Sequence, residues 1–200
     1  GAFFTHVSYK DARGIDELER LARLVTEDGT PKLQLWNDED EWSGYRKLGD
    51  HVLHIELARR NAVFLVAPLC ANTLAAFALG QSYNLLTSLH RAWYYDLHDS
   101  FTGPICKKFG RHSVNKPIIV APAMNTFMLE QNITHTHLRS LKERGVEVIE
   151  PAVKILACGD KGKGAMAEVA EIVRVVMGSL EAYETEVMHA ASSNKPLFAP

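Results

Sequence analysis

The chain has 200 residues, 46% of them hydrophobic, and its 22 basic and 24 acidic side chains leave a net charge of -2. This length and composition predict one domain with a sizeable core. The near balance of charge argues against nucleic acid as a partner. The chain has neither an apolar run of bilayer length nor a secretory signal pattern, so we expect a soluble, cytoplasmic protein without a membrane partner.

The cysteines are three in number and lie far apart, at Cys70, Cys106 and Cys158. An odd count without a CxxC pair argues against both a disulfide framework and a metal site. We therefore expect no metal.

The N-terminal third of the chain predicts two helices and two strands. Leucines at helical spacing predict a helix over 14–25, and alternation of polar and apolar residues predicts a strand over 32–36. The acidic stretch 37–42 is too polar to be buried and predicts a loop. A helical pattern follows over 52–60, and the continuous apolar run 62–67 is typical of a buried parallel strand.

The remainder repeats this alternation of helices and buried strands. Asn72 is a candidate cap for a helix that Gly80 ends, and Asn125 is predicted to start another. The further expected elements are helices over 84–93, 134–144 and 165–179 and strands over 117–121 and 146–149.

Apolar strands alternating with helices predict an α/β fold, a doubly wound (Rossmann-like or flavodoxin-like) parallel sheet flanked by helices in a single domain. We expect this domain to span 1–189, with a loop insertion at about 94–115 and a disordered tail at 190–200. Ligands of such sheets bind beyond the carboxyl ends of the strands.

Three loops are expected at that edge. The first, 67–74, combines small residues with Asn72 and Thr73, so it exposes backbone N–H groups at a helix N-terminus that suit a phosphate. The second, 121–128, places Asn125 beside methionines, although Met and Phe there also suit an ordinary core. The third, 156–168, is rich in glycine and indicates a mobile flap. Because such a loop is a poor place to bury a thiol, we favour a reactive role for Cys158.

Together the segments APLCANTL, PAMNTFM and ACGDKGKGAMAE resemble the flavin-dependent cysteine decarboxylases, the flavoprotein family of phosphopantothenoylcysteine decarboxylases and bacterial peptidyl-cysteine decarboxylases. The segment DHVLHIEL at 50–57 extends the resemblance, which covers most of the chain between Leu35 and Val176. His54 alone would more often be structural. Its place in the family pattern implies a catalytic role.

The resemblance implies an FMN cofactor and a homotrimer with active sites at subunit interfaces. It also implies that catalysis uses His54, Asn125 and Cys158, that FMN contacts Cys70, Ala71, Asn72, Thr73 and Ala123, and that the substrate contacts Asn125 and Ala157. Asn125 would hold the substrate carboxylate, and His54 would assist thiol deprotonation.

The implied reaction is the decarboxylation of 4'-phosphopantothenoylcysteine to 4'-phosphopantetheine in coenzyme A biosynthesis. FMN would oxidise the thiol-bearing carbon to a thioaldehyde, which accepts the electron pair as carbon dioxide leaves. Cys158 would then protonate the enethiolate during re-reduction. Two alternatives stay open: a non-catalytic family member that acts as a protein phosphatase inhibitor subunit, and a peptidyl-cysteine decarboxylase.

Overall fold

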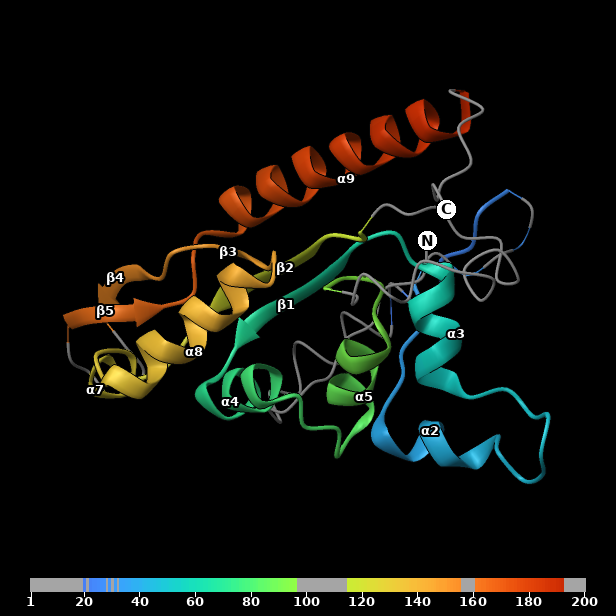
Figure 1. The fold of residues 1–200 in the computed structure, drawn as a ribbon, viewed down its shortest axis with the longest axis horizontal. Helices are drawn as coiled ribbons and strands as arrows, with labels where there is room; N and C mark the ends of the chain where they lie inside the picture. The colour runs from blue at the N-terminus through green and yellow to red at the C-terminus, as the bar shows by residue number, and fades with distance from the viewer. Residues whose placement is uncertain are drawn as a thin grey trace, which may run out of the picture. The chain divides into compact units, whose positions relative to one another are not determined.

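The computed structural model describes residues 20, 22–27, 29, 31, 33–96, 115–155 and 161–192 (Figure 1). Contacts within the chain divide it into two compact units. One contains Gly1–Asn61 and Ser82–Trp93, and the other contains Ala62–Gln81 and Tyr94–Pro200. The second unit carries the three-stranded sheet.

The sheet of the second unit has three parallel strands in the order β1-β2-β3. They are β1 (Phe64–Leu69), β2 (Ile118–Pro122) and β3 (Glu147–Val148). Phe64 is the partner of Ile118, and Ile119 is the partner of Glu147. The strands predicted over 62–67, 117–121 and 146–149 are thus confirmed, although the third is short and its Glu147 is exposed.

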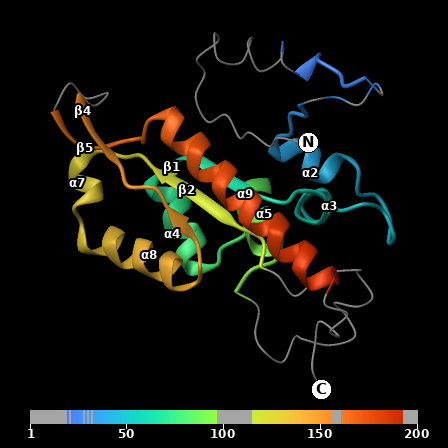
Figure 2. The same ribbon diagram turned by 90° about the horizontal axis from the view of Figure 1, so that it is seen from above.

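Helices cover both faces of this sheet (Figure 2). Helix α9 (Val169–Ser192) crosses one face, and α4 (Ala71–Leu79) and α8 (Asn132–Glu143) lie on the other. On the α9 face, buried Ile119 and Ala121 cluster with Ile149 and Ile172. On the α4 face, the rings of Phe64 and Phe77 lie 6.3 Å apart. Because successive side chains of a strand point to opposite faces, the same sheet contributes apolar side chains to a core on each of its faces. The prediction of a doubly wound α/β fold is confirmed.

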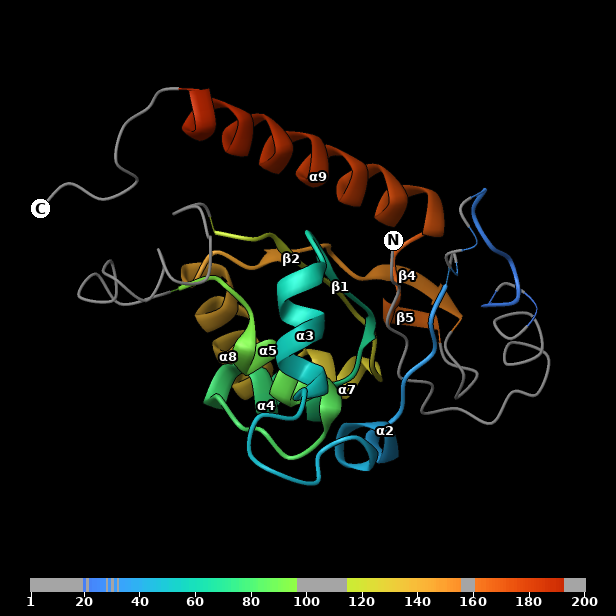
Figure 3. The same cartoon turned by 90° about the vertical axis from the view of Figure 1, so that its right-hand side faces the viewer.

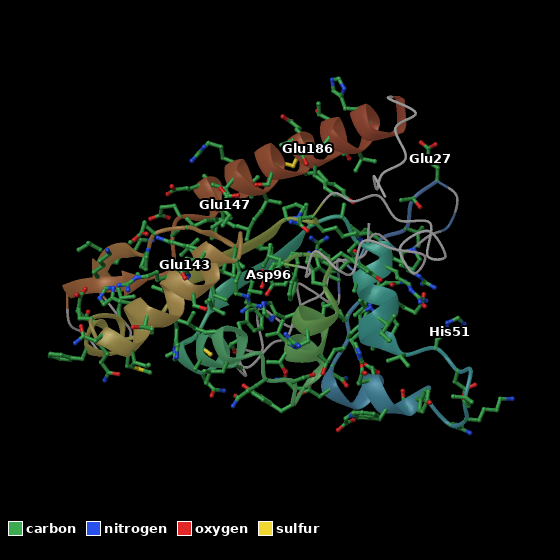
Figure 4. The ribbon with its side chains drawn as sticks, viewed as in Figure 1. Glu27, His51, Asp96, Glu143, Glu147 and Glu186 are labelled. Carbon is green, nitrogen blue, oxygen red and sulfur yellow. The ribbon has the colours of Figure 1, made fainter. Side chains whose placement is uncertain are left out.

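The end of α4 is braced by Arg144, the residue that ends α8. Its guanidinium donates to the Phe77 carbonyl at 3.0 Å and to the Tyr95 hydroxyl at 2.6 Å. It also forms an ion pair at 2.7 Å with Asp96, which is labelled in Figure 4. Gly80 ends α4 at a φ of 69°, as the sequence predicted.

An antiparallel hairpin of β4 (Ala152–Ile155) and β5 (Lys161–Ala165) lies beside the short helix α7 (Thr126–Leu129). Residues 161–165 of the glycine-rich segment, which was predicted as a mobile loop, therefore form a strand. The reason is packing: a Cβ at Gly162 would lie 2.2 Å from Thr126 Oγ1, so only glycine lets this strand approach so closely. Helix α9 consequently starts after Ala165 and continues to Ser192, into the segment predicted as a tail.

The first unit contains α2 (Asp38–Ser43), α3 (Leu53–Arg60) and α5 (Leu85–Ala92) (Figure 3). Helices α3 and α5 pack together, and Leu57 and Leu89 are buried. The acidic stretch predicted as an exposed loop is instead helical, because Asn37 forms a capping box with Asp40. The strand predicted over 32–36 is irregular chain over 33–36.

Several predictions fall outside the described residues. They are most of the helix at 14–25, most of the insertion at 94–115, the first part of the glycine-rich loop at 156–160, and the tail beyond 192. No described helix has both the length and the apolar character needed to span a membrane.

Candidate functional site

The first candidate loop is the turn from β1 into α4. Cys70 is the N-cap residue of α4, so the helix begins earlier than the predicted cap at Asn72. The thiol of Cys70 is exposed, lies 3.4 Å from Thr73 Oγ1 and makes no side-chain bond to the helix amides. The first turn, which includes Ala71, thus presents its N–H groups and the positive end of the helix dipole.

The second candidate loop is joined to the first. The Ala123 amide donates to the Leu69 carbonyl at 2.9 Å, and Leu69 is also the strand partner of Pro122. Both loops therefore lie together beyond the carboxyl ends of β1 and β2. Asn125 caps α7, because its Oδ1 accepts the Phe127 amide at 2.8 Å. This bond orients the carboxamide, in which the nitrogen is the donor group.

The hairpin is tied to the second loop by two hydrogen bonds. The Met124 amide donates to the Gly164 carbonyl at 2.9 Å, and Thr126 Oγ1 donates to the Lys163 carbonyl at 2.8 Å. Ala157 and Cys158 fall between the paired residues Ile155 and Lys161, outside the described residues.

The remaining predicted residue, His54, belongs to the first unit and has a buried partner. Its Nδ1 lies 2.5 Å from Glu41 Oε1, and its backbone N–H donates to Glu41 Oε2 at 3.1 Å. The Glu41 side chain is 4% exposed and that of His54 is 24% exposed. Glu41 was missed by the sequence analysis, which placed the acidic stretch in solvent.

Helix α2 places two of its carboxylates at the N-termini of other helices. Glu41 accepts from the first turn of α3, and Asp38 Oδ1 accepts from the Leu85 amide of α5 at 2.9 Å. Val52, the N-cap residue of α3, makes no side-chain hydrogen bond that caps this helix. The partial positive charge of the two helix ends therefore explains why an acidic run is partly buried.

The structure thus brings Cys70, Ala71, Asn72 and Thr73 together with Ala123 and Asn125 at one edge of the sheet. The sequence profile of the Flavoprotein family matches residues 5–181. The chain belongs to the Flavoprotein family.

Curated relatives within this family carry the name phosphopantothenoylcysteine decarboxylase. The protein of that name from Arabidopsis thaliana is 47% identical over 145 residues, which are 72% of this chain and 60% of the relative. The one from Mus musculus is 40% identical over 162 residues, which are 81% of this chain and 70% of the relative. The chain therefore spans about 60% of the length of the Arabidopsis relative.

Solved flavoproteins share the fold. A cysteine-to-serine mutant of PPC decarboxylase complexed with pantothenoylaminoethenethiol is 44% identical, with a TM-score of 0.63 over 78% of this chain and 76% of that one. The FMN binding protein AtHal3 is 42% identical, with a TM-score of 0.57 over 84% of this chain and 75% of that one.

Proposed function

We propose that this chain is an FMN-dependent decarboxylase of 4'-phosphopantothenoylcysteine, forming 4'-phosphopantetheine in coenzyme A biosynthesis. The observation that carries the proposal is the joining of the α4 N-terminus, the Asn125 loop and the β4–β5 hairpin at the carboxyl edge of a parallel sheet. The identities to relatives named for this activity support the substrate.

The donors at this edge fit FMN. Cys70 offers no side-chain cap to α4, so the amides of the first turn suit a phosphate or the polar edge of a flavin. Ala71, Thr73 and Ala123 are small enough to let a flat ring approach the backbone. When bound, FMN would supply oxidation of the thiol-bearing carbon, which creates an electron sink for decarboxylation.

The residues of the chain would hold the substrate and move its protons. The Asn125 carboxamide is oriented by the bond that its oxygen accepts from the Phe127 amide, and its nitrogen would donate to the substrate carboxylate until carbon dioxide leaves. Cys158, with Ala157 beside it, would protonate the carbon of the enethiolate that decarboxylation leaves. His54 would take the proton of the substrate thiol.

We further propose a cytoplasmic homotrimer in which active sites combine residues of neighbouring subunits. The family resemblance supports this assembly. The test is the mass of the purified chain by light scattering, with and without FMN. Trimer mass supports the proposal, and a monomer that turns over at full rate would contradict it.

The activity is tested by the visible spectrum of the purified protein and by release of carbon dioxide from phosphopantothenoylcysteine. We expect a flavin spectrum, turnover of the substrate, and loss of turnover in Cys158→Ser with FMN still bound. Cys106→Ser is the matched control, because it also replaces one thiol by a hydroxyl, at a position without an assigned role in the site, and it should retain turnover.

A protein that neither binds added FMN nor releases carbon dioxide would contradict the proposal and favour the phosphatase inhibitor alternative. Release of carbon dioxide only from peptides with a C-terminal cysteine would instead assign the chain to the peptidyl-cysteine decarboxylases.

A further inference from the structure

Glu41 is a buried carboxylate, and both hydrogen-bond donors that it meets among the described residues belong to His54. Taking a carboxylate out of water is costly unless donors replace the lost hydration. Here the backbone N–H and the ring Nδ1 of His54 replace it, at 3.1 Å and 2.5 Å. Because each carboxylate oxygen has its own bond to one residue, neither the ring nor the carboxylate can turn without breaking a contact.

These two bonds determine which ring nitrogen carries the proton. An ionised carboxylate only accepts hydrogen bonds, so Nδ1 must be protonated where it faces Glu41 Oε1. In a neutral imidazole the other nitrogen, Nε2, is then an acceptor. The side chain of His54 is 24% exposed, so its ring remains accessible to solvent.

We propose that Glu41 is a positioning residue that holds His54 in the Nδ1–H tautomer, so that Nε2 accepts the proton of the substrate thiol. The S–H bond breaks, an Nε2–H bond forms, and the thiolate stays with the substrate. The imidazolium so formed faces the Glu41 carboxylate, which stabilises it. The identity of the proton donor rests on the proposed function, whereas the tautomer does not.

Glu41→Gln gives a sharp test, because its amide offers one acceptor and one donor group. If the amide oxygen keeps the bond from the His54 backbone, the amide nitrogen faces Nδ1, which must then become the acceptor. We therefore expect the ring to change to the Nε2–H tautomer. Nitrogen-15 NMR of the full chain labelled at its nine histidines reads both nitrogens directly. The spectrum is recorded at pH 9, where an ordinary imidazole is neutral, and His54→Gln assigns the signals.

Two variants control for a merely structural role. Asp38→Ala removes the other bond that α2 makes to a helix N-terminus, without touching His54. Glu56→Gln removes a carboxylate on α3 that lies 3.7 Å from His51, a histidine that is 85% exposed (Figure 4). We expect both variants to keep the Nδ1–H tautomer of His54.

Kinetics then connect the tautomer to the reaction. In Glu41→Gln we expect kcat to fall roughly 10- to 100-fold with little change in KM, the usual effect of removing a partner that orients a functional imidazole. The Asp38 and Glu56 variants should keep the kcat of the unmodified chain.

An unmodified chain whose His54 carries its proton on Nε2 overturns the proposal, even if Glu41→Gln fails to fold. So does a folded Glu41→Gln variant that keeps the original tautomer. The NMR reading needs neither FMN nor substrate. The expected tautomers in a chain without any turnover would therefore uphold the positioning role of Glu41 and refute the proposed decarboxylase alone.

Discussion

Gly164 is the point at which the β4–β5 hairpin comes closest to the Asn125 loop, and its replacement by alanine should separate the two. Its φ is 139°, and an added Cβ would lie 2.2 Å from the Met124 carbonyl oxygen. The hairpin would have to withdraw by about 0.8 Å to reach the 3.0 Å limit of real Cβ contacts. An alanine forced into this backbone conformation costs about 1–3 kcal/mol, and overpacking costs about as much again.

The hairpin can relieve part of this strain by giving up the bond from the Met124 amide to Gly164, which contributes about 0.5–1.5 kcal/mol. We therefore expect Gly164→Ala to lower the free energy of unfolding by about 2–4 kcal/mol. For a chain of this length that is a fall in Tm of roughly 5–15 °C. Because the hairpin flanks the segment that holds Cys158, decarboxylation should fall as well.

The assays are urea denaturation and hydrogen exchange at the Met124 amide. Gly178→Ala is the matched control, because Gly178 lies within α9 and a Cβ there would meet nothing within 4 Å. That variant should gain up to about 1 kcal/mol from the higher helix propensity of alanine. A Gly164→Ala protein as stable as the unmodified chain, with unchanged exchange at Met124, would refute this reasoning.

Three further substitutions test the packing and charge of the sheet unit. A lysine in Arg144→Lys cannot reproduce the planar guanidinium that reaches three partners. We therefore expect the free energy of unfolding, measured in urea, to fall by about 1–3 kcal/mol. Exposed Arg139→Lys, within α8, is the control and should lower it by about 0.5 kcal/mol or less. Ile119→Ala truncates a fully buried side chain and should lower the free energy of unfolding by about 2–5 kcal/mol. A fall of less than about 1 kcal/mol would contradict the burial of Ile119. The hydrogen bond from Lys142 lowers the pKa of Glu150 below its ordinary 4.5. The stability that this carboxylate contributes is therefore full above pH 4.5 and is lost as the pH falls through the lowered pKa. In Glu150→Gln the loss of unfolding free energy at acid pH should be smaller than in the unmodified chain, by less than about 1 kcal/mol because the Lys142–Glu150 pair is largely exposed. An unchanged dependence of stability on pH would show that the pair is not formed.

Features that depend on neighbouring residues alone could be predicted from the sequence. Continuous apolar runs identified β1 and β2, because runs of this length and composition are typical of parallel strands. Only β2 is buried throughout, whereas β1 also has exposed residues. Gly80 and Asn125 were predicted at helix ends, because left-handed backbone and amide capping are local requirements. The edge at which the loops would gather followed from the parallel order of the strands.

Features that depend on distant partners needed the tertiary structure. The acidic stretch predicted a solvated loop, yet Glu41 is buried, because the first turn of α3 and the ring of His54 replace the water that its charge requires. The glycines of β5 indicated freedom of movement, whereas Gly162 and Gly164 allow close packing against Thr126 and Met124. Sequence alone determined the α/β fold and its loops, because periodicity and capping are properties of adjacent residues. Only the tertiary structure decided which carboxylate meets His54 and which strand holds the Asn125 loop, because both contacts join residues that are far apart along the chain.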